Sequence, residues 1–173
     1  TATITGNNTF TGDTDHMGGT IVLGNDNALG TGTLLLNGGA LQSDNDARNV
    51  ANAVTFGADL AINAGQNLQL SGNADLGGAT RTITTNNTTT TLSGVLSNGS
   101  LTKAGAGTLN LSGANTYTGD TTVTAGTLGL SGGSAIADTG LVNLSTAGAT
   151  VSVNNDETIG ALSGIAGTTV DLT

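Results

Sequence analysis

Residues 108–130 read TLNLSGANTYTGDTTVTAGTLGL. Two runs in this stretch, TLNL at residues 108–111 and TLGL at residues 127–130, carry leucine at alternate positions. Alternation with period two is typical of a β-strand that buries one face. The glycine-, threonine- and asparagine-rich residues between the runs favour turns. The stretch therefore predicts short strands that recur with each turn of a β-solenoid, about 20 residues long.

A second copy of the pattern lies near the start of the chain. Residues 4–23, ITGNNTFTGDTDHMGGTIVL, align without a gap with residues 111–130 at an offset of 107, and ten of the twenty positions are identical. We expect one continuous β-helix segment over residues 1–173, with a first repeat copy at about 1–100 and a second at about 101–173. We interpret it as an excerpt of a longer chain, with turns between strands at NGG 37–39, SNG 97–99 and SGG 131–133.

The composition restricts the class of protein. Three Lys and Arg residues stand against twelve Asp and Glu, for a net charge of −9, so clustered basic side chains for nucleic acid or anionic membranes are lacking. Aromatic residues are 2%, which argues against a β-sandwich and for a thin aliphatic core. The absence of proline fits stacked strands, because proline cannot donate a backbone N–H to the ladder. The composition favours an all-β fold without cysteine chemistry.

Residues 103–128, KAGAGTLNLSGANTYTGDTTVTAGTL, resemble the autotransporter-associated β-strand repeat, also called the passenger-associated transport repeat. The resemblance covers residues 4–41 and 101–153 best. It implies a single-stranded, right-handed parallel β-helix in the passenger of a type V secreted protein at the bacterial cell surface. It also implies a role in passenger folding and secretion, and a C-terminal outer-membrane β-barrel in the full-length chain. The family has no catalytic residues to carry over.

The first copy departs from the second at residues 15–18, DHMG, where the second copy reads TVTA. In the gap-free alignment His16 falls on the inward-pointing position of Val123. Either the turn is locally bulged, or a His-Met pair was introduced at an artificial junction.

Few side chains suggest chemistry. His16, flanked by Asp13 and Asp15, could be a metal ligand or a general base, but no second histidine supports it and we favour a structural role. Asp13 with Asp15, and Asp44 with Asp46, could supply oxygen ligands to calcium, but neither pair has the spacing of a calcium loop. Solvated turns explain both pairs better, and we assign no metal, cofactor or catalytic residue.

A carbohydrate-active β-helix enzyme would need two carboxylates at a suitable separation, usually beside aromatic side chains. The nearest pair, Asp156 and Glu157, would point to opposite faces if it lay in a strand. The aromatic residues are Phe10, Phe56 and Tyr117, and we expect Phe10 and Tyr117 to cap the interior of their turns. Residues 105–107, GAG, lack the third glycine and the lysine of a phosphate loop, so we expect a turn.

The threonine runs at residues 80–84 and 88–91 suggest the flat Thr-x-Thr ladders of ice-binding solenoids. The pairs at residues 9 and 11, 82 and 84, and 122 and 124 do not keep one turn spacing in the sequence, so we favour solvated strand surfaces.

These observations predict a non-enzymatic β-helix of roughly eight turns, at about 20 residues a turn. It would assist passenger folding and secretion and act as a rigid display stalk, extracellular or at the bacterial cell surface, either attached to the outer membrane or secreted. The alternative is an adhesin or a self-associating filament or biofilm protein, and a lesser one is a carbohydrate-active enzyme. Expected partners are other copies or cell-surface molecules. Nucleic acid is not expected, and the segment itself is not expected to be embedded in a membrane.

Overall fold

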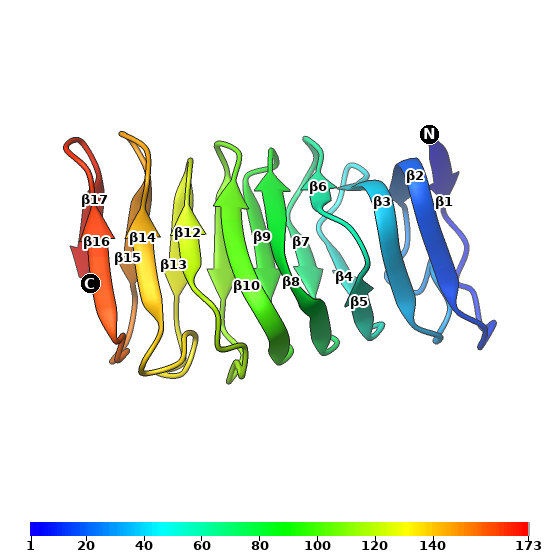
Figure 1. The fold of residues 1–173 in the computed structure, drawn as a ribbon. Coiled ribbons are helices and arrows are strands. Elements are labelled where there is room, and N and C mark those ends of the chain that lie inside the picture. Colours follow the sequence, from blue (N-terminus) through cyan, green and yellow to red (C-terminus); the bar gives the residue numbers. More distant parts are fainter. Residues whose placement is uncertain (173) are drawn as a thin grey trace.

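The computed structural model describes residues 1–172, a stretch that contains 17 β-strands and no helix. The strands lie side by side along one axis, with the two ends of the chain at opposite ends of the stack (Figure 1). Every strand pair in this stretch is parallel. The parallel β-helix predicted from the sequence is confirmed.

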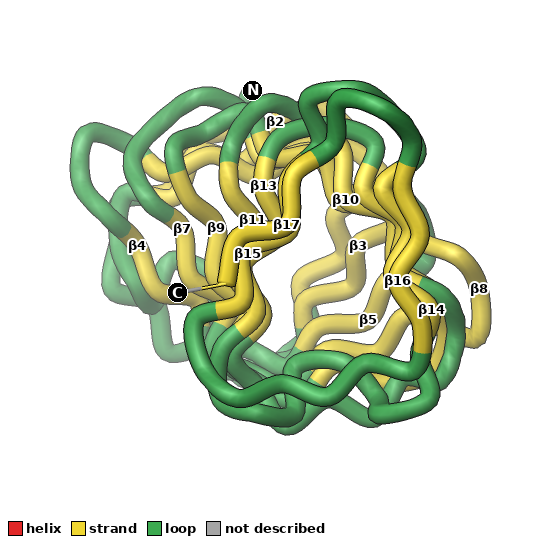
Figure 2. The backbone as a smooth tube through the Cα atoms, turned by 90° about the vertical axis from the view of Figure 1, so that its left-hand side faces the viewer, coloured by secondary structure: helices red, strands yellow, loops and turns green. Residues whose placement is uncertain are grey.

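The strands form two sheets. The first sheet contains β1 (Ala2–Ile4), β2 (Thr14–Leu23), β3 (Leu34–Ser43), β5 (Val54–Phe56), β6 (Leu60–Ile62), β8 (Ala74–Thr85), β10 (Leu96–Ala104), β12 (Thr121–Val123), β14 (Leu141–Leu144) and β16 (Ala161–Gly164). The second sheet contains β4 (Arg48–Val50), β7 (Leu68–Leu70), β9 (Thr89–Leu92), β11 (Thr108–Leu111), β13 (Thr127–Leu130), β15 (Thr150–Val153) and β17 (Thr169–Leu172). Seen along the stack, the sheets are walls around one interior (Figure 2).

Turn length varies along the stack. Thr108 pairs with Thr89 and with Thr127, which are equally far from it in the sequence, whereas the step from Thr127 to its next partner, Thr150, is longer. Nine strands follow one another along the first sheet, and the stack has about nine turns, where the sequence predicted roughly eight. The difference arises because an incomplete turn at each end still contributes a strand.

Like residues stack on like in the core. Leu70, Leu92, Leu111 and Leu130 occupy one ladder of the second sheet, and none is more than 2% exposed. The turns repeat the same alternation, so each inward leucine meets the leucine of the next turn. The apolar interior is thus continuous along the axis.

The long strands of the first sheet bend through a corner without ending. Gly38 and Gly39 in β3, and Asn98 and Gly99 in β10, have positive φ values of 147°, 85°, 54° and 139°. Parallel pairing resumes on the far side of each corner after a register shift. The predicted turns at residues 37–39 and 97–99 were therefore wrong as strand ends, because a bulge turns the chain while neighbouring backbone groups still pair.

Candidate functional site

His16 lies in β2 with its side chain turned inward. It is 4% exposed, and its Nε2 atom is 3.1 Å from the carbonyl oxygen of Ala40. Its ladder is not that of Val123: His16 pairs with Leu36 before the corner, whereas Val123 pairs with Leu144 beyond it. The gap-free alignment missed this because the register of β2 shifts on both sides of Met17. The inward orientation and the local bulge are confirmed, and the assigned ladder was wrong.

Tyr117 is an interior side chain, as predicted. It is 1% exposed, and its hydroxyl lies 2.8 Å from Oγ1 of Thr121, the one hydrogen-bonding partner that the structure gives it. Burial raises the pKa of Tyr117 to about 12. Phe56 is fully buried as well. Both rings fill the core, where no ligand could stack on them.

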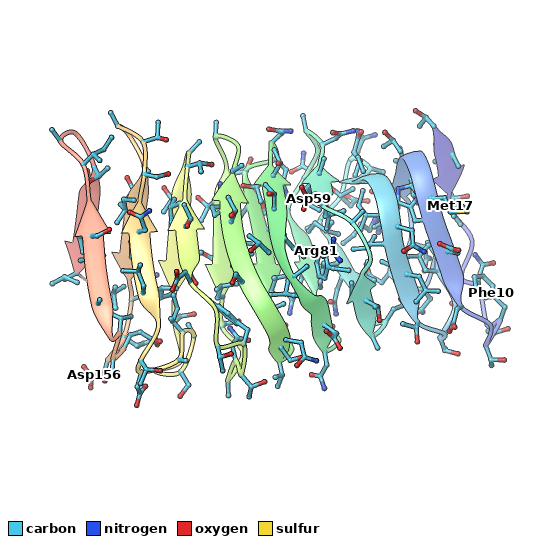
Figure 3. All side chains as sticks on the ribbon, in the orientation of Figure 1. Phe10, Met17, Asp59, Arg81 and Asp156 are labelled. Atoms are coloured by element: carbon cyan, nitrogen blue, oxygen red, sulfur yellow. The ribbon has the colours of Figure 1, made fainter. Side chains whose placement is uncertain are left out.

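Phe10 does not cap its turn. It is 47% exposed at the N-terminal end of the stack, where it is labelled together with Met17 (Figure 3). Its backbone carbonyl accepts the N–H of Thr31 at 2.9 Å, which places the ring over Gly30. Leu29, 1% exposed, belongs to the core at this level. The sequence prediction for Phe10 was therefore wrong: its ring lies against Gly30 and almost half of the residue is exposed.

The acidic pair near the N-terminus, Asp13 and Asp15, forms hydrogen bonds that stabilise the fold. Asp13 accepts the backbone N–H of Thr33 at 2.9 Å, and Asp15 accepts an Nδ2 hydrogen of Asn37 at 2.7 Å. Both contacts join one turn to the next, so the two carboxylates are engaged with separate donors.

The second acidic pair surrounds an arginine. Asp44 accepts two hydrogen bonds from Arg48, both 2.8 Å long, and Asp46 accepts one at 3.2 Å. The hydrogen bond from Arg48 holds the pKa of Asp44 below its usual value. Among the residues that the structure describes, no group of three or more His, Asp or Glu side chains could hold a metal ion.

Asp156 and Glu157 lie in the loop between β15 and β16 (Figure 3 labels Asp156), so the strand geometry expected for them does not apply. Glu157 accepts the backbone N–H groups of Ala135 and Ile136 at 3.0 and 2.7 Å. Asn115 continues this contact, since it donates to the carbonyl of Ala135 and accepts the N–H of Leu96. A chain of side-chain hydrogen bonds thus joins four successive turns, and the sequence did not reveal it.

Lys103 is a buried charged residue that the sequence analysis did not predict. It lies in β10 between Ile83 and Val123 of the neighbouring turns, and all three side chains are fully buried. The alternation of Leu101 with Lys103 along one strand was the available signal. Burial lowers the pKa of Lys103 to about 8.

Backbone carbonyl groups satisfy this ammonium group. Its Nζ atom donates to the carbonyl oxygens of Ala104 and Gly105 at 2.8 Å each, and to that of Ala125, one turn on, at 3.1 Å. No carboxylate in residues 1–172 forms an ion pair with it. Gly105, with φ of 80°, begins the turn expected at residues 105–107, so that prediction is confirmed. The lysine therefore ties two turns together at a corner.

Single threonines form ladders on the outer faces of both sheets. Thr82, Thr102 and Thr122 pair in one ladder of the first sheet. The second sheet has a longer ladder made of Thr89, Thr108, Thr127, Thr150 and Thr169. These are ladders of single threonines. The Thr-x-Thr pairs do not recur in each turn, because Thr84 pairs with Ala104, so the structure does not contradict the expectation of solvated strand surfaces. The second sheet thus carries a neutral row of five threonines, whereas the ladder of the first sheet continues from Thr122 into Asn143.

A groove on the second sheet adds one unmatched polar atom. It encloses about 280 Å³ and is lined in part by Arg48, Asn49, Gln69 and Thr91. The Oδ1 atom of Asn49 is buried without a hydrogen-bond partner, while its backbone N–H donates to Asp26 at 3.0 Å.

Two comparisons with known proteins found matches to this chain. Residues 1–23 and 101–130 match the model of the passenger-associated-transport-repeat. Over 118 residues the chain is 38% identical to "Adhesin BmaC autotransporter" of Brucella suis biovar 1 (strain 1330), a match that covers 64% of this chain and 3% of that protein. No solved structure matches the chain.

Within residues 1–172 there is no helix of the length and apolar character needed to cross a membrane. The repeat match falls on both stretches in which the sequence copies were found. The chain carries passenger-associated transport repeats, and its recognition from sequence as a passenger segment of autotransporter type is confirmed.

Proposed function

We propose that this β-helix is a non-enzymatic structural segment of a type V secreted surface protein. It assists folding and secretion of the passenger and holds other parts of the protein away from the cell, as a rigid extracellular stalk. The observation that carries the proposal is the unbroken parallel ladder from β1 to β16, in which each turn pairs with the one before it. The match to a passenger transport repeat supports the same role.

The ladder also explains how secretion and folding would be coupled. Each completed turn presents unpaired backbone groups on which the next turn can form, and neighbour contacts alone stabilise a repeat structure of this kind. The carboxylates of Asp15, Asp44 and Glu157 are engaged with donors of the chain itself. A stalk role requires nothing more of them, which favours a non-enzymatic segment.

In-register deletion tests the stalk. Removing residues 89–107 moves Thr108 into the ladder position of Thr89 and shortens the stack by one turn. Removing residues 98–107 deletes only half a turn and misaligns everything after it. In the protein displayed on cells, we expect the first deletion to preserve surface exposure, measured by protease accessibility on intact cells, and the second to abolish it. Equal display of both deletions, or of neither, would contradict the proposal.

A second candidate is adhesion or self-association. It is favoured by the neutral threonine ladder of the second sheet and by the relative named as an adhesin. Many weak contacts between such faces would add up along the axis. Thr108→Lys together with Thr127→Lys places like charges on the ladder and should abolish aggregation of protein-coated beads. If beads coated with the unmodified protein do not aggregate, this candidate is refuted and the stalk function remains.

A further inference from the structure

We propose that Asn37 and Asn98 are sites of spontaneous modification, at which asparagine converts to aspartate or isoaspartate, and that Asp15 and Asp75 restrain the conversion. These are the two places in the sequence where asparagine precedes glycine. Glycine has no Cβ, so its backbone nitrogen can approach the amide carbon of the preceding side chain. The proposal is independent of the proposed function.

Both asparagines lie at the corner of the first sheet, outside the ladder of paired residues. Each is exposed, and each is skipped by the ladder: the pairing of β3 passes from Leu36 to Gly38, and that of β10 from Ser97 to Gly99. Asn98 also has a positive φ of 54°. A residue outside the ladder lacks the regular backbone pairing that holds its neighbours, so its backbone and side chain are freer to meet.

An aspartate of the preceding turn contacts each asparagine. Asn37 donates an Nδ2 hydrogen to Asp15 at 2.7 Å, and Asn98 donates one to Asp75 at 3.0 Å. Asp75 is itself fixed by the backbone N–H of Gly77 at 2.7 Å. Because the reactive amide must rotate toward the next residue, a hydrogen bond that holds it to the neighbouring turn slows the reaction.

The reaction needs only the chain and water. The backbone nitrogen of Gly99 attacks Cγ of Asn98, a bond forms between them, and the bond from Cγ to Nδ2 breaks. Ammonia leaves and carries off the proton that the backbone nitrogen gives up. Water then adds to either carbonyl of the resulting five-membered imide and opens it to aspartate or isoaspartate, with one proton released. A trough of about 530 Å³, lined by Asp75, Asn98 and neighbouring glycines, admits that water.

The product alters the corner. Each conversion replaces an amide donor by a carboxylate, so Asp75 would face a second negative charge in place of a hydrogen bond. The isoaspartate form also adds one methylene to the backbone path at the bulge. Both changes weaken the link between successive turns, and the modified chain becomes more acidic by one charge per site.

The test follows the full chain in mildly alkaline buffer at physiological temperature, by peptide mapping and by enzymatic methylation of isoaspartate. We expect conversion at Asn37 and Asn98 to be faster than at every other asparagine. Asp75→Ala should raise the rate at Asn98 about fivefold, as expected for loss of one exposed charge-assisted hydrogen bond, and leave Asn37 unchanged. Asp15→Ala should raise the rate at Asn37 by a similar factor and leave Asn98 unchanged.

Each variant thus carries its own control, because a general loss of folding would accelerate both sites equally. Asn98→Gln should abolish the signal at that position, since the larger ring it requires forms more slowly. Conversion no faster than at the remaining asparagines would overturn the proposal. So would an aspartate variant that accelerates both sites or neither.

Discussion

Replacement of Lys103 by methionine should change how stability depends on pH. The ammonium group is fully buried, and burial lowers its pKa from 10.5 to about 8. Between these two values the unfolded chain holds the proton and the folded chain does not. Stability of the unmodified protein therefore rises with pH across this window, because the unfolded state binds more protons. The full shift corresponds to about 3 kcal/mol.

The Lys103→Met variant keeps the length of the side chain and its contacts with Ile83 and Val123, but it has no proton to lose. We expect its stability relative to the unmodified protein to fall by about 3 kcal/mol as the pH rises from 7 to above 10. Urea unfolding midpoints measured at a series of pH values give this difference. Tyr117, with a pKa raised to about 12, lowers stability above pH 10, but equally in both proteins, so its effect cancels.

Ile83→Met provides the matched control, since it changes the same ladder one turn earlier without a titrating group. Its effect on stability should be the same at every pH in the series. A constant difference between the Lys103→Met variant and the unmodified protein from pH 7 to 10, or one of opposite sign, would refute the reasoning. The lysine would then remain charged in the folded protein, held by its three carbonyl partners.

Three further substitutions, the last with a control variant, test the packing, the hydrogen bonds of the loop that contains Glu157, and the close approach of turns. Leu109→Ala, at a fully buried ladder position, should lower the free energy of unfolding by about 2–5 kcal/mol in urea titration. Glu157→Gln replaces one of two acceptor oxygens by a donor and should cost about 1–3 kcal/mol, visible as a lower thermal midpoint. Gly39→Ala should prevent correct folding by circular dichroism, because its Cβ would lie 2.6 Å from the carbonyl oxygen of Gly19, whereas Gly18→Ala, with open space and no positive φ, should fold normally.

The repeating features of the fold could be predicted from the sequence, because successive turns carry similar residues at equivalent positions. Leu109 and Leu128 alternate with polar neighbours in each run, and the structure pairs them directly. Tyr117 was also predicted to be interior. Periodic burial leaves a periodic sequence, so the architecture could be predicted from the alternation and the repeat.

Features that depend on turn length could not be predicted from the sequence. Thr127 pairs with Thr108 on one side and with Thr150 on the other, and the second step along the sequence is longer than the first, so no constant period identifies their ladder. The same variation moved His16 away from the ladder of Val123. Insertions accumulate in the loops and corners, where the sequence carries no inward alternation to count.

Interior polar groups were missed for a different reason. The carbonyl partners of Lys103 come from backbone atoms of two turns, and a backbone carbonyl leaves no trace in the amino-acid sequence. Glu157 is similar, because its two partners are backbone N–H groups of a loop about one turn earlier. Such contacts become visible only when the turns are stacked.

Stacking also explains why the chain carries so few charges. Equivalent residues of successive turns are only about 4.8 Å apart, so a like charge repeated on one ladder would repel its neighbour strongly. On the ladder of Asp15, the next positions are Leu35 and Thr55, and Asp75 follows three turns later. That separation of about 14 Å exceeds the screening length of about 10 Å at moderate salt. The turn after each of these aspartates supplies an asparagine donor, Asn37 or Asn98, so negative charge is tolerated where distance and a donor both reduce its cost.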